Sequence, residues 1–300
     1  MRIRSRIAAV ISVAFALVIV LALILMLGRG SQETPEALDL APRISSFAAG
    51  LDPERPYRPP DVAERRAGAE GFTVLLDGGN AAGTRLQELG FSIQDGVDSA
   101  TGRRYTLVMN EPGTDRAWGL YLIDRSAPPS IVVEIPHPNS DLRTEQMGLS
   151  YFRMVPGAVL LMAGAHRRAG TQADVAHREN SMFHAIATEL AERGYGQIQF
   201  HGFHDSSQPG KDIVLSAGAA RVDDTAWRMA DRLTVAGFTL CHAWAESCRG
   251  LEGNANVQGK MAAANGTAFM HIEVSSTIRA DERSREAVVR ALVAARAASY

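Results

Sequence analysis

The chain has 300 residues, of which 46% are hydrophobic, and a formal net charge of -2 at pH 7. This length allows one large domain or two small ones, and the hydrophobic fraction is sufficient for a sizeable core. The chain is nearly neutral and has neither a long basic block nor aromatic residues that alternate with Arg or Lys. These features argue against a nucleic-acid-binding protein.

Residues 1–29 predict a membrane anchor. Arg2, Arg4 and Arg6 precede an uncharged apolar run from Ile7 to Leu27. At about 1.5 Å per residue, a helix of this length spans about 30 Å, which is the thickness of the hydrocarbon core of a bilayer. Basic residues ahead of the run favour a cytoplasmic amino terminus, as in a single-pass protein of a cell inner membrane. A cleaved signal peptide is the alternative, and both interpretations place the globular part in the periplasm or another extracytoplasmic space.

Residues 30–68 predict an extended linker, because they contain six prolines and little periodic apolar pattern. We expect the folded domain to comprise residues 69–300. The chain has only two cysteines, Cys241 and Cys248. In an oxidising compartment they can pair across a short loop, and the alternative is two unrelated thiols.

The pattern of the folded part predicts an α/β protein. Short β-prone runs bounded by turn residues predict strands at 72–76, 91–94, 105–110 and 118–124. Six further strands are predicted at 131–136, 158–164, 197–203, 212–216, 239–244 and 269–275. Helices are predicted between them, up to residue 153 and over 175–193, 224–236, 257–264 and 281–298. This alternation favours a mixed, mostly parallel central sheet flanked by helices, with an antiparallel edge formed by the early strands.

Polar side chains follow or interrupt three of the predicted parallel strands. His137 comes directly after an apolar strand, and two carboxylates, Asp141 and Glu145, follow within a few residues. His201 lies near the end of a later strand, and Glu273 lies inside the last one. Because ligand sites in such sheets gather at the carboxyl ends of the strands, we expect these side chains to converge.

Two imidazoles and one carboxylate form a ligand set that suits zinc, which keeps an open position for water in catalytic sites. The sequence therefore predicts a zinc ion held by His137, Asp141 and His201. Asp141 is favoured because a short turn places it near His137, and Glu145 is the alternative carboxylate ligand.

Glu273 is predicted to be the general base. A glutamate within an apolar strand is costly to bury unless it is paired, solvated or close to a cation. Here it would take a proton from the zinc-bound water and later give it to the leaving amine. The alternative is a structural ion pair with Arg279 or Arg249.

Further polar residues follow the predicted strands and helices. Arg167 suits a bidentate clamp on a substrate carboxylate, although a solvated basic turn explains it equally well. His204 is a candidate for the lining of the cleft. Asp174 is predicted to be the N-cap of the helix over 175–193, and His177 beside it is either part of the same cap or a partner of a metal ligand.

Three segments together resemble the phage and bacterial poly-γ-glutamate hydrolases, which belong to the zinc carboxypeptidase and aspartoacylase fold group. These segments are I-P-H-P-N-S-D-L-R-T-E, I-Q-F-H-G-F-H-D and M-H-I-E-V-S-S-T-I-R. The resemblance extends over roughly residues 131–279, about half of the chain.

The resemblance implies a zinc carboxypeptidase-like fold and roles for individual residues. His137 and His201 match the two zinc-binding histidines, Glu273 the catalytic glutamate and Arg279 the arginine that follows it. Arg279 or Arg167 is expected to orient a substrate carboxylate or to stabilise the oxyanion. The chain departs from the family at the carboxylate ligand. The carboxypeptidases keep H-x-x-E and the hydrolases a glycine-rich run before a Glu, whereas three residues separate His137 from Asp141 here.

The function predicted from these residues and this resemblance is a membrane-anchored, extracytoplasmic, zinc-dependent hydrolase that cleaves an amide bond. The resemblance suggests an acidic or γ-glutamyl substrate, and an envelope location makes cell-wall peptides equally reasonable. The alternative is a non-catalytic ligand- or metal-binding protein on the same fold. A serine hydrolase is disfavoured because the sequence contains no G-x-S-x-G segment.

Overall fold

The structure is a computed structural model, and it describes residues 37–79, 82–111 and 114–297. The predicted membrane anchor and the first residues of the predicted linker lie outside these ranges. Within them, no helix combines the length and the apolar character that a membrane span requires.

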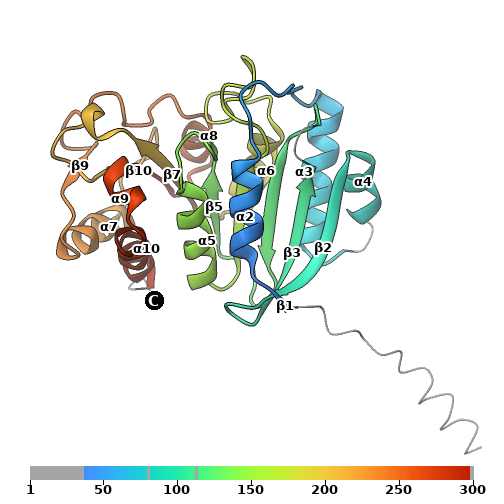
Figure 1. The fold of residues 1–300 in the computed structure, drawn as a ribbon, viewed down its shortest axis with the longest axis horizontal. Coiled ribbons are helices and arrows are strands. Elements are labelled where there is room, and N and C mark those ends of the chain that lie inside the picture. The colour runs from blue at the N-terminus through green and yellow to red at the C-terminus, as the bar shows by residue number, and fades with distance from the viewer. Residues whose placement is uncertain (1–36, 80–81, 112–113, 298–300) are drawn as a thin grey trace, which may run out of the picture. The chain divides into compact units, whose positions relative to one another are not determined.

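Ten strands in the described ranges form one mixed sheet (Figure 1). The strands are β1 (Ala37–Leu38), β2 (Phe91–Asp98), β3 (Arg103–Asn110), β4 (Gly119–Asp124), β5 (Ile131–Ile135), β6 (Ala158–Ala163), β7 (Gln197–Phe203), β8 (Ile213–Ser216), β9 (Leu240–His242) and β10 (Phe269–Ser275). Their order across the sheet is β1-β2-β3-β4-β6-β5-β7-β10-β8-β9.

The centre of the sheet is parallel, because β6, β5, β7 and β10 all run in the same direction. On one side, the pairs β2–β3, β3–β4 and β4–β6 are antiparallel, as the early hairpin pattern predicts, and the two-residue β1 pairs parallel to β2 at the edge. On the other side, β8 is antiparallel to β10, which the sequence did not predict. The predicted mixed α/β sheet with its antiparallel N-terminal part is therefore confirmed.

Helices cover both faces of the sheet. They are α2 (Leu40–Ala49), α3 (Val62–Leu76), α4 (Ala82–Glu88), α5 (Thr144–Met154), α6 (Met182–Glu192), α7 (Asp224–Val235), α8 (Val257–Asn265), α9 (Ser276–Ala280) and α10 (Glu282–Ala297), and a short 3₁₀ turn, η1, lies at Asp205–Ser207. One face packs against α2, α5, α7 and α10. The other packs against α3, α4, α6 and α8.

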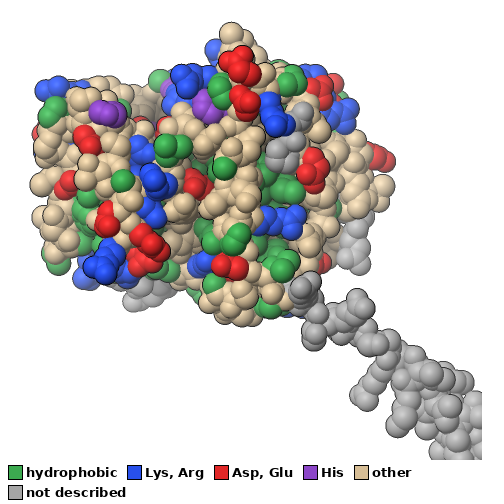
Figure 2. Space-filling view, in the orientation of Figure 1, with side chains coloured by type: hydrophobic (Ala, Val, Ile, Leu, Met, Phe, Trp, Pro, Cys, Tyr) green, Lys and Arg blue, Asp and Glu red, His purple; other side chains and the backbone are tan. Residues whose placement is uncertain are grey.

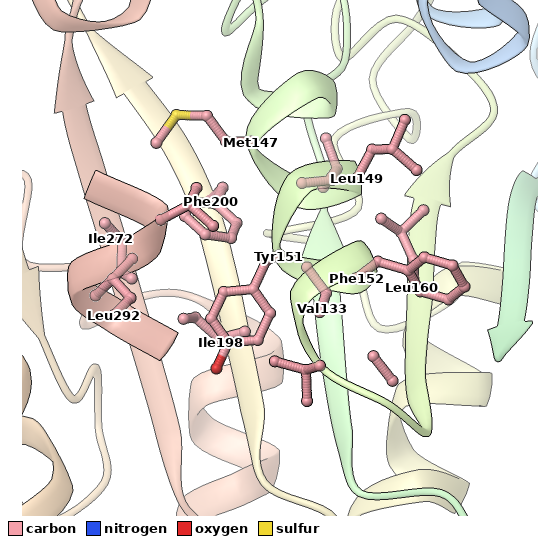
Figure 3. Packing of buried hydrophobic residues seen from close by; sticks show 14 of the residues in the cluster. Val133, Met147, Leu149, Tyr151, Phe152, Leu160, Ile198, Phe200, Ile272 and Leu292 are labelled. Atoms are coloured by element: carbon pink, nitrogen blue, oxygen red, sulfur yellow. The ribbon is translucent and has the colours of Figure 1, made fainter. Parts of the chain in front are cut away.

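The first of these faces holds a large apolar core (Figure 3). Val133, Ile198 and Ile272 come from three parallel strands and pack against Tyr151 of α5 and Leu292 of α10. Since side chains alternate along a strand, the residues next to these three point to the opposite face. On β7 these neighbours, Gln197 and Gln199, are polar, as is Glu134 on β5, whereas the other β5 neighbour, Val132, is apolar. The polar ones lie beneath the site described below.

Residues 40–49 and 62–76 correct two predictions. Part of the predicted linker is helix α2, which buries Leu40, Ile44 and Phe47 in the core. These apolar residues recur at helical spacing, and Pro42 lies in the first turn, where its missing N–H costs no intrahelical bond. The strand predicted at 72–76 is also wrong. Those residues end α3, whose capping box at its start satisfies the backbone of the first turn.

The helix predicted over 175–193 begins later than expected. Its N-cap is Ser181, whose hydroxyl accepts a hydrogen bond from the His184 N–H, and α6 begins at Met182. Residues 164–181 therefore form a loop after β6, and this loop brings Arg167 and Asp174 to the carboxyl edge of the sheet. Asp174 is not a helix cap.

Candidate metal centre

His137 and Asp141 lie on a tight turn that follows β5. The Asp141 N–H donates to the His137 carbonyl oxygen at 2.9 Å. Two residues of this turn, Asn139 and Arg143, have left-handed backbone conformations with φ of 60° and 71°. Asn tolerates this conformation better than most residues, and its Nδ2 donates to the Leu51 carbonyl oxygen at 2.6 Å. The turn therefore returns the Asp141 carboxylate to the His137 ring.

Two imidazole nitrogens converge on one carboxylate oxygen. His137 Nδ1 lies 3.2 Å from Asp141 Oδ2, and His201 Nδ1 lies 3.4 Å from the same atom. The Gly202 N–H also donates to this oxygen at 3.2 Å. All three side chains are buried. Two nitrogens and one carboxylate oxygen at this spacing fit the ligand preferences of zinc.

The second nitrogen of each histidine also has a fixed partner. His137 Nε2 lies 2.8 Å from Asp174 Oδ1, and His201 Nε2 lies 2.6 Å from Gln199 Oε1. Histidines that bind metals usually donate their other ring N–H to a carboxylate or carbonyl oxygen in this way, which fixes the ring and its tautomer. Both rings thus have their Nδ1 atoms directed to Asp141.

The electrostatics of the site favour a bound cation. Burial alone would raise the pKa of Asp141, but its hydrogen bonds with His137 and His201 hold that pKa well below the usual range. Burial alone would lower the pKa of His137, yet its contacts with Asp141 and Asp174 raise it. Burial lowers the pKa of His201 to about 4. The carboxylates of Asp141 and Asp174 thus favour a positive charge at this position. His201 stays neutral and keeps a lone pair that can bind a metal ion.

Glu273 lies beside His201 across the β7–β10 pairing. It is 9% exposed, and its Oε2 atom has no hydrogen-bonding partner among the described residues. Burial, and next the charge of Asp141, raise the pKa of Glu273 to about 8. Within the described residues, Glu273 forms no ion pair with Arg279 or Arg249. The alternative interpretation, a structural ion pair, therefore finds no support.

His271 packs next to the metal centre. Its ring stacks on that of His201 with a centroid distance of 4.3 Å, and its Nδ1 is buried without a partner in the described structure. His201, His271 and Glu273 are also close enough to hold an ion. However, His201 Nδ1 faces Asp141 and its Nε2 contacts Gln199, so this group shares its histidine with the first one.

Arg279 connects the three segments that bear the site. Its guanidinium donates to the carbonyl oxygens of Val274 at 3.0 Å, Leu142 at 2.6 Å and Phe203 at 3.1 Å. Those carbonyls belong to β10, the turn after β5 and the end of β7. Since Arg279 is buried and each of its nitrogens donates to backbone, its geometry indicates a positioning role rather than the predicted contact with substrate.

The other predicted residues differ in their placement. Arg167 lies at the rim, with Nη2 at 2.6 Å from Asp174 Oδ2 and Nη1 at 3.2 Å from His137 Nδ1. Glu145 lies in the first turn of α5 and belongs to neither candidate metal group in the described ranges. His204 caps η1 and contacts the Ser206 hydroxyl at 2.8 Å. Histidine side chains are visible on the surface at the upper edge of the molecule, toward which the central parallel strands run (Figure 2).

Sequence reasoning missed the roles of two residues. Asp174 has the local signature of a helix cap, since it precedes an apolar helical pattern, but it contacts His137 instead. Glu134 lies within the strand predicted at 131–136, where it is fully buried and accepts a hydrogen bond from Gln199 Nε2 at 2.8 Å. The sequence contains a signal for Glu134, because a carboxyl group inside an apolar strand needs a partner, as argued for Glu273.

No protein-family model matches the sequence, and no curated protein matches it. Solved structures with a similar fold include a bacteriophage poly-γ-glutamate hydrolase, at 15% identity and a TM-score of 0.43 over 60% of this chain and 88% of that one. A metallo-carboxypeptidase from Pseudomonas aeruginosa shares 14% identity, with a TM-score of 0.40 over 72% of this chain and 68% of that one. An aspartoacylase family protein from Mesorhizobium loti shares 10% identity, with a TM-score of 0.38 over 69% and 67%. The assignment of the site rests on its own geometry.

Proposed function

We propose that this chain is a zinc-dependent hydrolase that cleaves an amide bond. One observation carries the proposal: His137 Nδ1 and His201 Nδ1 both lie within 3.4 Å of Asp141 Oδ2, in a buried site. These three side chains would hold the ion. When bound, zinc acts as a Lewis acid that lowers the pKa of water and polarises a carbonyl group.

Glu273 is the acid–base residue of the proposed reaction. It takes a proton from the attacking water and gives it to the nitrogen of the leaving amine, so that the amide C–N bond breaks with no net change in the protonation of Glu273. Its position beside His201 in the β7–β10 pairing supports this role. The unpartnered Oε2 leaves an acceptor available for the proton.

The rim of the site favours an acidic substrate. The Arg167 side chain is 31% exposed and ends beside the ring of His137. Its Nε and Nη2 donate to Asp174, and its Nη1 and positive charge would attract a substrate carboxylate, which suits γ-glutamyl polymers and cell-wall peptides. We therefore propose a peptide-like or acidic polymer substrate.

We also propose an extracytoplasmic location, with the chain held at an inner membrane by residues 1–29. The apolar run behind three arginines supports the anchor. The Cys241–Cys248 disulfide supports an oxidising compartment. Fractionation of cells that express the full chain, with protease access tested from each side of the membrane, would check this location.

The test of function uses the purified full-length chain and its Glu273→Gln variant. We expect about one zinc per chain in both proteins, and hydrolysis of γ-glutamyl or cell-wall peptides only in the wild type. The loss of activity should be at least about 10²-fold. Zinc binding without hydrolysis of any amide would instead favour a non-catalytic binding protein. If the purified wild-type chain binds no zinc after incubation with the metal, the proposal is contradicted.

A further inference from the structure

A strip of buried polar side chains lies beneath the metal centre, on the sheet face opposite the large apolar core. Glu134 of β5 and His271 of β10 flank Gln199 of β7 in register. Glu134 and Gln199 have no exposed surface. Burying polar groups is unfavourable unless they are hydrogen-bonded, so the contacts of this strip should indicate what it contributes.

Gln199 is the centre of the strip and uses both ends of its amide. Its Nε2 donates to Glu134 Oε2 at 2.8 Å and approaches Gln258 Oε1 at 3.4 Å. Its Oε1 accepts from Asn256 Nδ2 and lies 2.6 Å from His201 Nε2. The Gln199 Oε1 atom thus contacts only nitrogen atoms in this network, and its Nε2 atom contacts only oxygen atoms. This pattern defines the orientation of the amide.

Two backbone groups fix the direction of this network. Gln258 Nε2 donates to the Val175 carbonyl at 3.0 Å, which leaves its Oε1 facing Gln199. Asn256 Oδ1 accepts from the Gly259 N–H at 3.0 Å, which leaves its Nδ2 facing Gln199. A carbonyl can only accept and a backbone N–H can only donate. Neither neighbouring amide can therefore rotate by 180° without losing its anchor.

The orientation of Gln199 determines the tautomer of His201. His201 has an oxygen on each side of its ring, Gln199 Oε1 at 2.6 Å from Nε2 and Asp141 Oδ2 at 3.4 Å from Nδ1. The shorter contact with Gln199 favours the proton of a neutral ring on Nε2, which leaves the lone pair on Nδ1. With Gln199 rotated by 180°, its amide N–H would face Nε2, and the proton would move to Nδ1. That proton would occupy the side of the ring that has to bind a metal ion.

We propose that the buried network of Gln199, Glu134, Asn256 and Gln258 is a positioning device that locks His201 in the tautomer able to bind the metal. The inference rests on the proposed metal site and deepens it. Gln199 is the residue through which the network acts, and Glu134 supports it by accepting from the opposite end of the amide.

The chain offers a matched control on the same strand. Gln197 lies two residues before Gln199, points to the same face and is also buried. Within the described ranges its Nε2 donates only to the Ala187 carbonyl, at 2.8 Å. Gln197→Met and Gln199→Met therefore make the same change in volume and polarity, but only the second removes a contact with His201.

The experiment measures the ¹⁵N chemical shifts of the His201 ring in the full-length chain, kept metal-free at neutral pH and assigned by comparison with His201→Gln. We expect a single Nε2–H tautomer in the wild type and in Gln197→Met, and a mixture of tautomers in Gln199→Met. Zinc affinity, measured by competition with a chelator, should fall about 10–100-fold in Gln199→Met alone. The exchange variant Glu134→Gln/Gln199→Glu, which again presents an oxygen to His201, should restore both readouts.

An unchanged His201 tautomer in Gln199→Met would overturn the inference, as would an equal loss of zinc affinity in Gln197→Met. The proposed function fails separately. If the wild type shows the single tautomer but binds no zinc or cleaves no amide, the network stands as a device that sets the tautomer, and the hydrolase proposal falls.

Discussion

Gly202 and Arg279 lie so close together that a Cβ atom at position 202 would be 2.3 Å from Arg279 Nε. Gly202 follows the candidate ligand His201, and its N–H donates to the Asp141 carboxylate. Arg279 in turn holds the three segments that carry the site. The lack of a side chain at position 202 therefore leaves the space that the Arg279 guanidinium occupies next to the metal centre.

Gly202→Ala should displace Arg279 and disturb the site. We expect a loss of about 1–3 kcal/mol in the free energy of unfolding, typical of overpacking in a buried region. Zinc affinity should fall as well, because Asp141 and His201 lie on segments that Arg279 connects. Urea unfolding and chelator competition would measure the two effects.

Gly196→Ala is the matched control for that variant. A Cβ at position 196 would meet Ala268 at 3.5 Å, which is an ordinary contact. This control should therefore retain both stability and zinc affinity. If Gly202→Ala behaves in the same way, Arg279 does not hold the site as the distances suggest.

The choice between two carboxylate ligands gives a second prediction. Loss of a residue that only hydrogen-bonds to a metal ligand typically weakens metal binding about 10–100-fold. Asp141→Asn should weaken zinc binding by more than this, because Asp141 is itself a proposed ligand. Glu145→Gln should leave zinc affinity unchanged, since Glu145 lies in the first turn of α5 and in neither candidate metal group. The opposite result in the same competition assay would assign the metal to Glu145.

Much of the site was predictable because it depends on regular structure. Apolar runs marked β5, β7 and β10, and the rule that parallel strands end at one edge brought His137, His201 and Glu273 together. The period of two along a strand also implies that Gln199 and His201 share one face. These inferences need only the strand positions, which the sequence specifies well.

The remainder depends on tertiary contacts that leave no local signature. Asp174 precedes an apolar helical pattern, as a cap would, and only the later start of α6 releases it to contact His137. Helix α2 was hidden by prolines, although Pro42 is harmless in a first turn. The turn that brings Asp141 back to His137 needs a left-handed conformation at Asn139, which spacing alone does not reveal.

Asp174 supplies a third prediction. Its Oδ1 lies 2.8 Å from His137 Nε2, so Asp174→Asn should lower zinc affinity about 10–100-fold while the protein stays folded. Asp205→Asn is a suitable control, because Asp205 also accepts several hydrogen bonds but does so from Thr277, in an exposed turn. Equal zinc affinities in the two variants would show that Asp174 does not support the ligand.

The last prediction concerns stability in the metal-free protein as the pH rises. Burial raises the pKa of Glu134 from 4.5 to about 8. Below pH 4.5 both the folded and the unfolded states hold this proton, and its contribution to stability is complete. Between pH 4.5 and about 8 the unfolded chain releases the proton while the folded chain keeps it, so stability falls with pH. Glu273 contributes in the same direction.

Glu134→Gln should therefore flatten the pH dependence without abolishing it. Between pH 6.5 and 8 the slope of the unfolding free energy should become less negative by up to about 1.4 kcal/mol per pH unit, the value for one proton. This window avoids His201, whose lowered pKa acts between about 4 and 6.5 and makes stability rise with pH there. Urea unfolding at a series of pH values would test this. If the free energy of unfolding depends on pH in the same way in the wild type and the variant, Glu134 ionises in the folded state as easily as in the unfolded chain.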